Sequence, residues 1–398
     1  MKIKLGVFFG GNSVEHEVSI ITAQQAMENL DREKYDVIPI YIAKNSKMYV
    51  GDLVGDIRNF KDIDNLINNS TQITLAQIDN KVALLKCNKQ LFGSNIYDYI
   101  DVAFPIVHGT NVEDGTLQGY LKMFNIPYAG CDVISSACGM DKYVFKCILK
   151  DNDIPTLDCK CFTYQDYTDD IDKLISDVEK KIPYPVIVKP VNLGSSVGIG
   201  IAKDQSELKK RIDDAFTYSK KVLVEKAVMN LKEVNCSVLG DYEEAKASEC
   251  EEPVKTDEIL SYKDKYISGG SKKGGSKSMN AGVLKLPADI TKEQKETIQK
   301  LALKTFKVLG ASGVIRIDFI IDQDDGRIYV NEPNTIPGSL SFHLWKATGL
   351  KYSDMLDKVI DLALKRHREE ENLTFSFDTN ILSGYTTNGL KGSKLLNK

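Results

Sequence analysis

The chain has 398 residues, of which 42% are hydrophobic and 27% are charged, and its formal net charge is −4. This composition is typical of a soluble globular protein, and the length predicts two or three domains. Because the two signs of charge are interspersed and no basic run is dense, we expect small molecules as partners and no nucleic acid.

Strand and helix patterns alternate over about the first 130 residues. The strand patterns cover residues 2–9, 37–42 and 100–107. A helix pattern covers residues 15–30, with Asn12 or Ser13 as its cap. This alternation predicts an open α/β sheet, which we assign to an N-terminal domain over residues 1–130.

The rest of the chain mixes short strand patterns with amphipathic helices. The helix patterns cover residues 134–150, 292–309 and 352–366, and the strand patterns cover residues 184–190, 199–202, 222–225, 233–239, 281–287, 314–321 and 327–332. We divide this part into a central domain (131–220), a C-terminal domain (221–370) and a polar tail (371–398), in which residues 373–377 could form a short strand. The expected fold class is α/β, with α+β character in the central and C-terminal parts.

A strand, a short acidic turn and a second strand run from residue 314 to residue 334. Since strand side chains alternate between faces, Arg316 and Asp318 share one face of the first strand. Glu332 and Asn334 share a face of the second, and antiparallel pairing brings the four together. Two carboxylates and an amide oxygen suit Mg²⁺, and an arginine suits phosphate oxygens. For this pattern alone, a surface hairpin with solvated charges is the alternative.

A loop of small residues at 194–200 follows the apolar strand that ends near Lys189. Backbone N–H groups of such a loop can cradle phosphates, and the lysine adds a positive charge. No GK[ST] motif is present, and the loop leads into a strand, which argues against a P-loop and a dinucleotide fold. A glycine-rich β-turn-β lid remains, with a plain hairpin loop as the alternative.

The apolar edge at residues 222–228 would suit an adenine ring, and Glu233 beyond it could accept from ribose hydroxyls. Outside this context, Glu225 and Glu233 would be ordinary exposed acids.

Two further polar residues follow strands of the N-terminal sheet. Glu15 lies in the first turn of its helix and could hold a substrate ammonium group at the sheet crevice, and His108 points at the same crevice. The alternatives are that Glu15, like Glu17, only decorates its helix and that His108 is structural.

The chain lacks a signal-peptide pattern and an apolar run of the roughly 20 residues that a membrane helix needs. Its eight cysteines are irregularly spaced, without a CxxC pair. We therefore expect a cytoplasmic protein without membrane association, with reduced, buried thiols and neither zinc nor a disulfide framework.

Several short runs occur in a fixed order along the chain. They are GGNSVEHEVS (10–19), HG followed by EDGTLQG (108–119), MDK (140–142), VKP (188–190), GSSVG (194–198), EK (225–226), YKDKY (262–266), RID (316–318) and NEPNTIPG (331–338). Together they resemble the D-alanine–D-alanine ligase family of ATP-grasp enzymes. The resemblance extends from the start to about residue 366 and implies a three-domain architecture and, by family expectation, a homodimer.

The resemblance also implies a reaction in two steps. The carboxylate of a first D-alanine, the donor, attacks the γ-phosphate of ATP, which gives an acyl phosphate. The amine of a second D-alanine, the acceptor, then attacks that carbonyl and phosphate leaves. The dipeptide would serve as a precursor of peptidoglycan. ATP and two Mg²⁺ ions would be required, with Mn²⁺ as a possible substitute.

The family's ATP, metal and intermediate-stabilising residues have counterparts in this sequence. By this match, ATP would be held by Lys142, Lys189, Ser196, Glu225, Lys226, Val228 and Glu233. Asp318, Glu332 and Asn334 would bind the two metal ions, with Glu332 between them. Arg316 and the N–H of Gly338 would stabilise the tetrahedral intermediate.

The remaining counterparts concern the amino-acid substrates. Glu15 would take the donor ammonium group and form a hydrogen-bonded set with Ser195 and Tyr266. The other expected substrate residues are His108, Lys265, Ser341 and His343.

The run at residues 339–345 departs from the family pattern. His343 stands where the family has a serine that grips the acceptor carboxylate, and a small shift would offer Ser341 instead. Alternative acceptors are D-serine, D-lactate or another amino acid, although Tyr266 in place of a histidine favours an amine. A catalytically silent ATP-binding protein is a further alternative.

Overall fold

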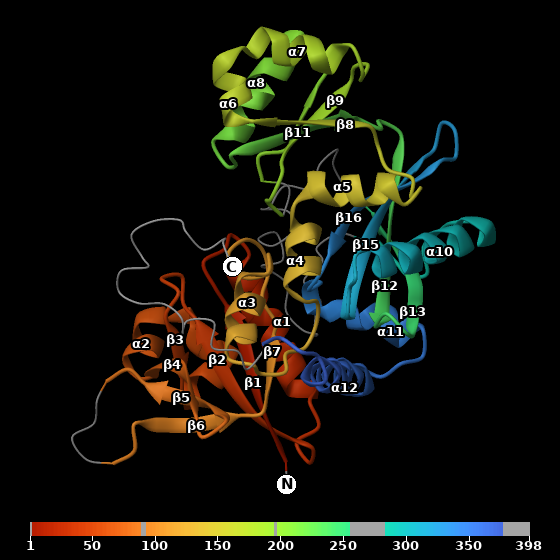
Figure 1. The fold of residues 1–398 in the computed structure, drawn as a ribbon. Helices are drawn as coiled ribbons and strands as arrows, with labels where there is room; N and C mark the ends of the chain where they lie inside the picture. Colours follow the sequence, from red (N-terminus) through yellow and green to blue (C-terminus); the bar gives the residue numbers. More distant parts are fainter. Residues whose placement is uncertain (1, 89–92, 195–196, 255–282, 377–398) are drawn as a thin grey trace, which may run out of the picture.

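The computed structural model describes residues 2–88, 93–194, 197–254 and 283–376, and the strands in these residues form three sheets (Figure 1). The mixed α/β fold expected from the sequence is confirmed. Within these residues, no helix is long and apolar enough to cross a membrane.

The N-terminal sheet has seven strands in the order β6-β5-β4-β3-β2-β1-β7. They are β1 (Ile3–Gly10), β2 (Tyr35–Ile42), β3 (Met48–Val50), β4 (Thr71–Ile78), β5 (Lys81–Lys86), β6 (Ile96–Ile100) and β7 (Val102–Pro105). Its helices are α1 (His16–Asn29), α2 (Ile63–Asn68) and α3 (Thr116–Met123), with 3₁₀ turns η1 (Asp52–Gly55) and η2 (Ile57–Lys61). β1 pairs in parallel with both β2 and β7, so the loops after β1 and β7 meet at one edge of the sheet.

A strand within residues 100–107 is confirmed as β7, but it is shorter than expected, because the chain breaks at Asp101. The Asp101 amide donates to the Lys4 carbonyl, and its carboxylate accepts from the Lys4 amide, both at 2.8 Å. Asp101 thereby separates β6 from β7. The expected helix cap is also wrong, since α1 begins at His16 with Glu15 at its N-cap position and no side-chain cap bond; the Ser13 hydroxyl accepts from the Glu15 amide at 3.1 Å instead.

A four-stranded sheet in the order β10-β9-β11-β8 forms the middle of the chain. Its elements are β8 (Cys159–Thr163), α6 (Tyr164–Asp169), α7 (Ile171–Glu179), β9 (Val186–Pro190), β10 (Gly200–Ala202), α8 (Gln205–Phe216) and β11 (Lys221–Lys226). Val188 and Val224 belong to the core that α7 and α8 form with one face of this sheet (Figure 1). Because side chains alternate, Lys189 and Glu225 point to the opposite face.

The third sheet has the order β14-β13-β12-β15-β16. Its elements are β12 (Leu231–Gly240), β13 (Ala245–Val254), β14 (Val283–Lys285), α10 (Lys292–Val308), β15 (Gly313–Asp322), β16 (Ile328–Asn334), η3 (Gly338–Ser341), α11 (Phe342–Ala347) and α12 (Tyr352–Glu371). Ile315, Ile317 and Phe319 share a core with α10. By alternation, Arg316 and Asp318 face away from α10.

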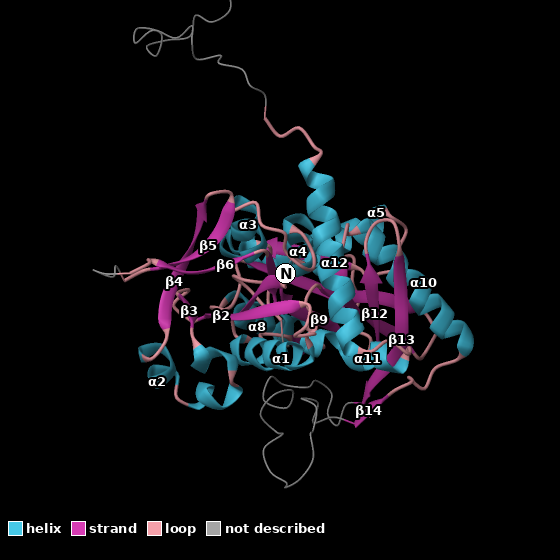
Figure 2. Ribbon diagram, turned by 90° about the horizontal axis from the view of Figure 1, so that it is seen from below, coloured by secondary structure: helices cyan, strands magenta, loops and turns pink. Residues whose placement is uncertain are grey.

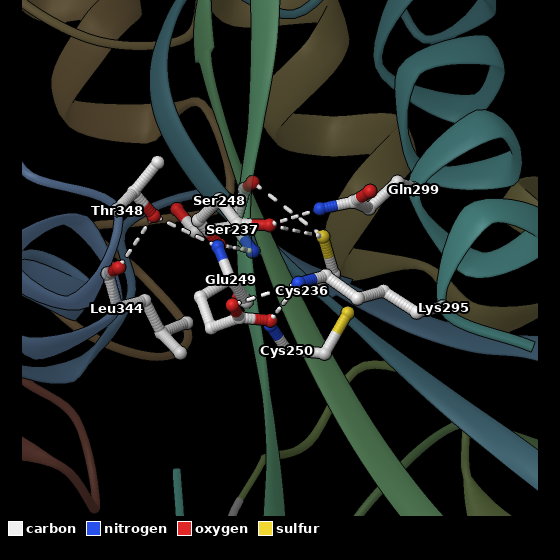
Figure 3. Close-up of polar contacts among 9 residues, drawn as sticks. All are labelled: Cys236, Ser237, Ser248, Glu249, Cys250, Lys295, Gln299, Leu344 and Thr348. Atoms are coloured by element: carbon white, nitrogen blue, oxygen red, sulfur yellow. Dashed lines mark hydrogen bonds and ion pairs between the residues drawn. The ribbon is translucent and has the colours of Figure 1, made fainter. Parts of the chain in front are cut away.

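Figure 3 shows the polar contacts where β12 and β13 meet α10 and α11. Ser248 accepts from the Ser237 amide at 2.9 Å, and Lys295 of α10 pairs with Glu249 at 2.7 Å. The Glu249 amide donates to Thr348, just after α11, at 2.8 Å. These bonds fix α11 against the sheet.

The single helix expected over residues 134–150 is wrong as well. It is two helices, α4 (Val133–Met140) and α5 (Lys142–Asp151), separated at Asp141. The Asp141 carboxylate accepts from the amides of Tyr143 and Val144, so it caps α5 at the N-terminus. The break turns α5 into the space between the second and third sheets (Figure 1).

Helix α12 returns from the third sheet to the first (Figure 2). Its residues Met355 and Val359 share a core with the N-terminal sheet. Arg366 donates to the carbonyls of Gly130 and Tyr128 at 2.8 and 2.6 Å. The last helix of the described chain is thereby packed on the N-terminal sheet.

Two smaller expectations need correction. Residues 373–376 form no strand, and the rest of that tail lies outside the described residues. The cysteine expectation is correct for Cys131, Cys236 and Cys250, which are buried, and wrong for Cys87 and Cys147, which are exposed.

Candidate active site

Glu15 lies between two glycines from different parts of the chain. A Cβ atom placed on Gly109 or on Gly194 would lie 2.8 Å from Glu15 Oε2. Both positions therefore need glycine if the carboxylate is to stay where it is. Since Gly194 begins the small-residue loop, the Glu15 carboxylate joins the edge of the first sheet to that loop.

His108 is buried behind this edge. Its Nε2 lies 3.1 Å from the Thr22 hydroxyl, and its ring also bonds to the Ile336 backbone. Burial lowers the pKa of His108 to about 4, although the bond to Ile336 opposes the shift. The imidazole is therefore neutral at pH 7, and it links the N-terminal sheet to the loop after β16.

Glu113 makes a second link between the same two regions. Its Oε1 accepts from the Ile336 amide at 2.9 Å and from the Thr335 hydroxyl at 3.1 Å, and its Oε2 accepts from the Gly109 amide at 2.9 Å. Burial, together with the charge of Glu15, raises the pKa of Glu113 to about 7. The loop that leads to Gly338 is therefore anchored on the N-terminal domain.

The four polar residues of the β15–β16 hairpin lie together, as the alternation predicts. Arg316 is paired with Asn334 across the two strands, and Asp318 with Glu332. Arg316 donates two hydrogen bonds to Asp318, at 2.7 and 2.9 Å, and the Asn334 amide donates to it at 3.1 Å. Burial raises the pKa of Asp318, while the Arg316 guanidinium opposes that shift.

This donor set fits a hard divalent cation. Two carboxylates and one amide supply oxygen ligands and leave room for phosphate oxygens and water, as Mg²⁺ prefers. Within the described part of the chain, no three His, Cys, Asp or Glu side chains gather as a zinc or iron site would require.

Two lysines face this set from other elements. Lys142, at the start of α5, lies 3.1 Å from Glu332 and donates to the Leu193 carbonyl at 2.9 Å. Lys189, at the end of β9, pairs with Glu225 and lies 3.5 Å from the amide oxygen of Asn331. Both ammonium groups thus lie beside the oxygen ligands of the β15–β16 hairpin. The phosphates of a nucleotide bound there would need positive charge.

The expected nucleotide residues differ in their surroundings. The Glu225 side chain is fully buried between lysines, so the exposed acid considered from the sequence is not what the structure contains. Lys226 lies 3.7 Å from Asp322, and Val228 is buried. Glu233 lies on β12, with its charge acting on both Lys189 and Asp318.

The segment that departs from the family pattern forms a tight turn. Ser339, Leu340 and Ser341 have φ angles of 51°, 49° and 53°, a left-handed conformation that residues other than glycine seldom adopt. A Cβ atom on Gly338 would meet no atom of the described residues within 4 Å, so open space borders its backbone. Such strained turns concentrate at functional sites.

The two candidates for the acceptor carboxylate occupy different surroundings after this turn. The Ser341 hydroxyl is fully buried and has no hydrogen-bond partner among the described residues. His343 lies with its Nε2 at 2.5 Å from the Glu251 carboxylate, which also accepts from the Asn235 amide at 3.0 Å. Burial opposes the charge of Glu251, but His343 and Arg316 hold the pKa of its carboxyl below the usual range.

Four expected site residues, Ser195, Ser196, Lys265 and Tyr266, lie outside the described residues. In the other direction, the structure adds Lys146 and Glu251, which the sequence reasoning missed, and gives contacts to Glu113, which the sequence placed beside His108 at the same crevice. Lys146 had a usable signal, because it stands four positions after Lys142 on one helix face. Glu251 had none, since its contacts come from α11 and from β12, far away in the sequence.

Models of known families match almost the whole chain. The model described as "D-ala D-ala ligase N-terminus" matches residues 4–131, and the model described as "D-ala D-ala ligase C-terminus" matches residues 148–361. A D-alanine–D-alanine ligase of Thermosipho melanesiensis is 41% identical over 383 residues, which cover 96% of this chain and 98% of the relative.

Solved structures agree in fold over a similar length. The D-alanine–D-alanine ligase of Coxiella burnetii has a TM-score of 0.76 and 30% identity, and the comparison covers 93% of this chain and 96% of that one. The VanG D-Ala:D-Ser ligase of Enterococcus faecalis has a TM-score of 0.75 and 32% identity, covering 91% and 100%.

Three sheets, with an oxygen-ligand hairpin in the third and lysines of α5 and β9 beside it, define an ATP-grasp ligase. Within that class, the chain belongs to the D-alanine–D-alanine ligase family.

Proposed function

We propose that this protein joins two D-alanine molecules into D-alanyl-D-alanine while ATP is converted to ADP and phosphate. The observation that carries the proposal is the set of Asp318, Glu332 and Asn334, with Arg316 beside it and Lys142 and Lys189 facing it. The proposal is supported by D-alanine–D-alanine ligases that are 41% and 39% identical to this chain over 96% and 95% of its length.

The first chemical step would take place between the hairpin and the two lysines. An oxygen of the donor carboxylate bonds to the γ-phosphorus, and ADP leaves. Lys142 and Lys189 would hold the phosphates, where fixed positive charge favours the transfer. Divalent ions on Asp318, Glu332 and Asn334 would neutralise charge on the phosphate oxygens.

The second step would form the peptide bond. The acceptor nitrogen bonds to the activated carbonyl carbon, the amine loses its proton, and phosphate leaves with the oxygen that came from the donor carboxylate. Arg316 and the Gly338 N–H would stabilise the oxygen that becomes negative. Glu15 would hold the donor ammonium group, because it lies at the sheet edge beside the loop that begins at Gly194.

The acceptor side would be recognised by the turn after Gly338. His343 is held by Glu251 near Arg316, and the Ser341 hydroxyl lies within the turn. Ser195, Ser196, Lys265 and Tyr266 would complete the lid and the acceptor pocket, as the family resemblance implies.

Further parts of the proposal concern the ions and the assembly. We propose two Mg²⁺ ions, which Mn²⁺ could replace, since all the donors are oxygens. We also propose a homodimer in the cytoplasm, and sedimentation of the purified protein would test the assembly.

The test is ADP release from ATP in the presence of D-alanine alone, then with D-serine or D-lactate added, with product masses recorded. We expect D-alanine alone to support turnover and D-alanyl-D-alanine to be the main product in the mixtures. A mixed product in preference to D-alanyl-D-alanine would assign a different acceptor. No D-alanine-dependent release would refute the proposal.

A further inference from the structure

Helix α5 presents two lysines to carboxylates of two different sheets. Lys142 lies 3.1 Å from Glu332 of β16, and Lys146 lies 2.8 Å from Glu225 of β11. Because residues four apart lie on the same helix face, one face of α5 carries both cations. In Figure 1, α5 lies between the sheet of β11 and the sheet of β16.

The Lys146–Glu225 pair is almost completely withdrawn from solvent. The exposed fractions of the side chains are 2% for Lys146 and 0% for Glu225. Lys146 also donates to the Thr156 hydroxyl at 3.0 Å. The other oxygen of Glu225 pairs with Lys189, so one buried carboxylate lies between two ammonium groups.

Of the two lysines that contact Glu225, Lys146 and Lys189, only Lys189 is assigned to the nucleotide phosphates. Lys189 lies at the end of β9, before the small-residue loop, and faces the Asn331 side chain beside the metal set. A phosphate at Lys189 would compete with Glu225 for the same ammonium group. A buried carboxylate without a cation is strongly destabilised, so it needs a second partner when a phosphate engages Lys189.

We propose that Lys146 is a positioning residue of the nucleotide site, which neutralises Glu225 so that Lys189 can engage a nucleotide phosphate. The proposal rests on the proposed function, which assigns Lys189 to the phosphates, and it deepens that assignment. Burial opposes the charge of Glu225, but the two lysines together hold the pKa of its carboxyl at about 2. Glu225 is therefore an anion throughout the working range of pH.

The alternative is that Lys146 only stabilises the fold. The two roles differ in what happens when Glu225 loses its charge. If Lys146 acts by neutralising Glu225, its removal keeps Lys189 on Glu225 and weakens phosphate binding, but has no such effect in a chain that already carries Glu225→Gln. If Lys146 acts only on stability, its removal has the same effect in both chains.

The experiment measures binding of the non-hydrolysable analogue AMP-PNP with Mg²⁺ by isothermal titration calorimetry, for the full chain. We expect Lys146→Met to weaken binding about tenfold or more, as for the loss of a partner in a buried charge pair. Because Glu225 itself belongs to the proposed nucleotide site, the double variant Lys146→Met/Glu225→Gln is compared with Glu225→Gln alone, and the two should bind within about threefold of each other. Lys150→Met, which removes an exposed lysine of the same helix, should bind as the wild type does.

A loss in Lys146→Met that is absent when Glu225→Gln is also present would support the proposal, and a loss that persists there would overturn it. If Lys146→Met alone does not fold, as circular dichroism would show, the comparison of Glu225→Gln with the double variant remains. They should still differ by less than about threefold, because Lys146 has no anion left to neutralise. A larger loss in the double variant would overturn the proposal. Since AMP-PNP binding needs no D-alanine, failure of the dipeptide reaction would be recognised separately.

Discussion

Asp318 accepts hydrogen bonds from two other residues of the β15–β16 hairpin, Arg316 and Asn334. Arg316 donates to both of its oxygens, Asn334 donates to one of them, and Glu332 lies opposite it on β16. Because β15 is a central strand, held by β12 on one side and β16 on the other, these side chains are fixed in place. Such rigidity favours a site whose donors must meet phosphate oxygens in one geometry.

Replacing either carboxylate of this set should remove turnover. We expect Asp318→Ala and Glu332→Ala to lower the rate of ADP release by about a thousandfold or more, because the charge of the transferring phosphate loses its compensation. Asp325→Ala, in the exposed turn of the same hairpin, is the matched control and should leave the rate unchanged. Wild-type rates in both carboxylate variants would refute the metal assignment.

The buried imidazole of His108 should make stability depend on pH. Burial lowers its pKa from the ordinary 6.5 to about 4, so in this window the unfolded chain binds a proton that the folded chain does not. Lowering the pH from 6.5 to 4 therefore favours unfolding. We expect the free energy of unfolding to fall by roughly 3 kcal/mol more in the wild type than in His108→Gln over this interval, measured by urea denaturation. Equal losses in the two proteins would contradict the assignment.

Site residues whose contacts lie close to them in the sequence could be predicted from the sequence. Arg316, Asp318, Glu332 and Asn334 follow from alternation across one hairpin turn. Glu251 could not be found, because His343 and Asn235 reach it from α11 and from a neighbouring strand.

The turn η3 connects the β15–β16 hairpin to α11 through three successive residues with left-handed backbone conformation. The Ser339 amide donates to the Thr22 hydroxyl at 3.1 Å, so helix α1 of the N-terminal domain holds the turn. Leu340 is buried in the same core as the N-terminal sheet. The fold therefore compensates for the unfavourable backbone conformation through contacts with another domain.

Substitutions at Ser339 should report this strain. Its φ of 51° suits glycine, so Ser339→Gly should change the free energy of unfolding by less than about 1 kcal/mol. Ser339→Val should lower it by about 1–3 kcal/mol, because a β-branched residue fits poorly at this φ. Ser206→Val, in the exposed face of helix α8, measures the same side-chain change at ordinary dihedrals. A valine at 339 as stable as a glycine would contradict the assigned conformation.

Some boundaries of helices and strands could not be predicted from local sequence patterns. Residues 134–150 look like one apolar helix, but the Asp141 side chain competes for backbone amides and restarts the helix. The strands β3 to β6 were not predicted, since they are partly exposed and their pairing partners decide where they form.

The whole molecule brings three sheets to one site. Glu15 lies after β1 at the start of α1, Lys189 lies on β9 of the middle sheet, and Asp318 lies on β15 of the third sheet. Helix α5 joins the second sheet to the third through Lys142 and Lys146, and Glu113 joins the first sheet to the loop after β16. The site is therefore complete only when all three parts are assembled.

The expected fold class and the family resemblance agree with the structure and the comparisons, because the order of short runs along a chain is visible in its sequence. The packing of α12 back on the first sheet was not predicted. That contact depends on Arg366 meeting carbonyls more than 200 residues away in the chain, and no local pattern carries that information.

The central claim is that the donor carboxylate is activated by phosphoryl transfer at the Arg316–Asn334 hairpin. The most direct measurement uses D-alanine with ¹⁸O in both carboxylate oxygens, and records the masses of the phosphate and the dipeptide after turnover with unlabelled ATP. We expect D-alanyl-D-alanine as the product. For each dipeptide formed, one ¹⁸O atom of the donor carboxylate should appear in phosphate. Unlabelled phosphate, or ATP turnover without a dipeptide, would contradict this claim.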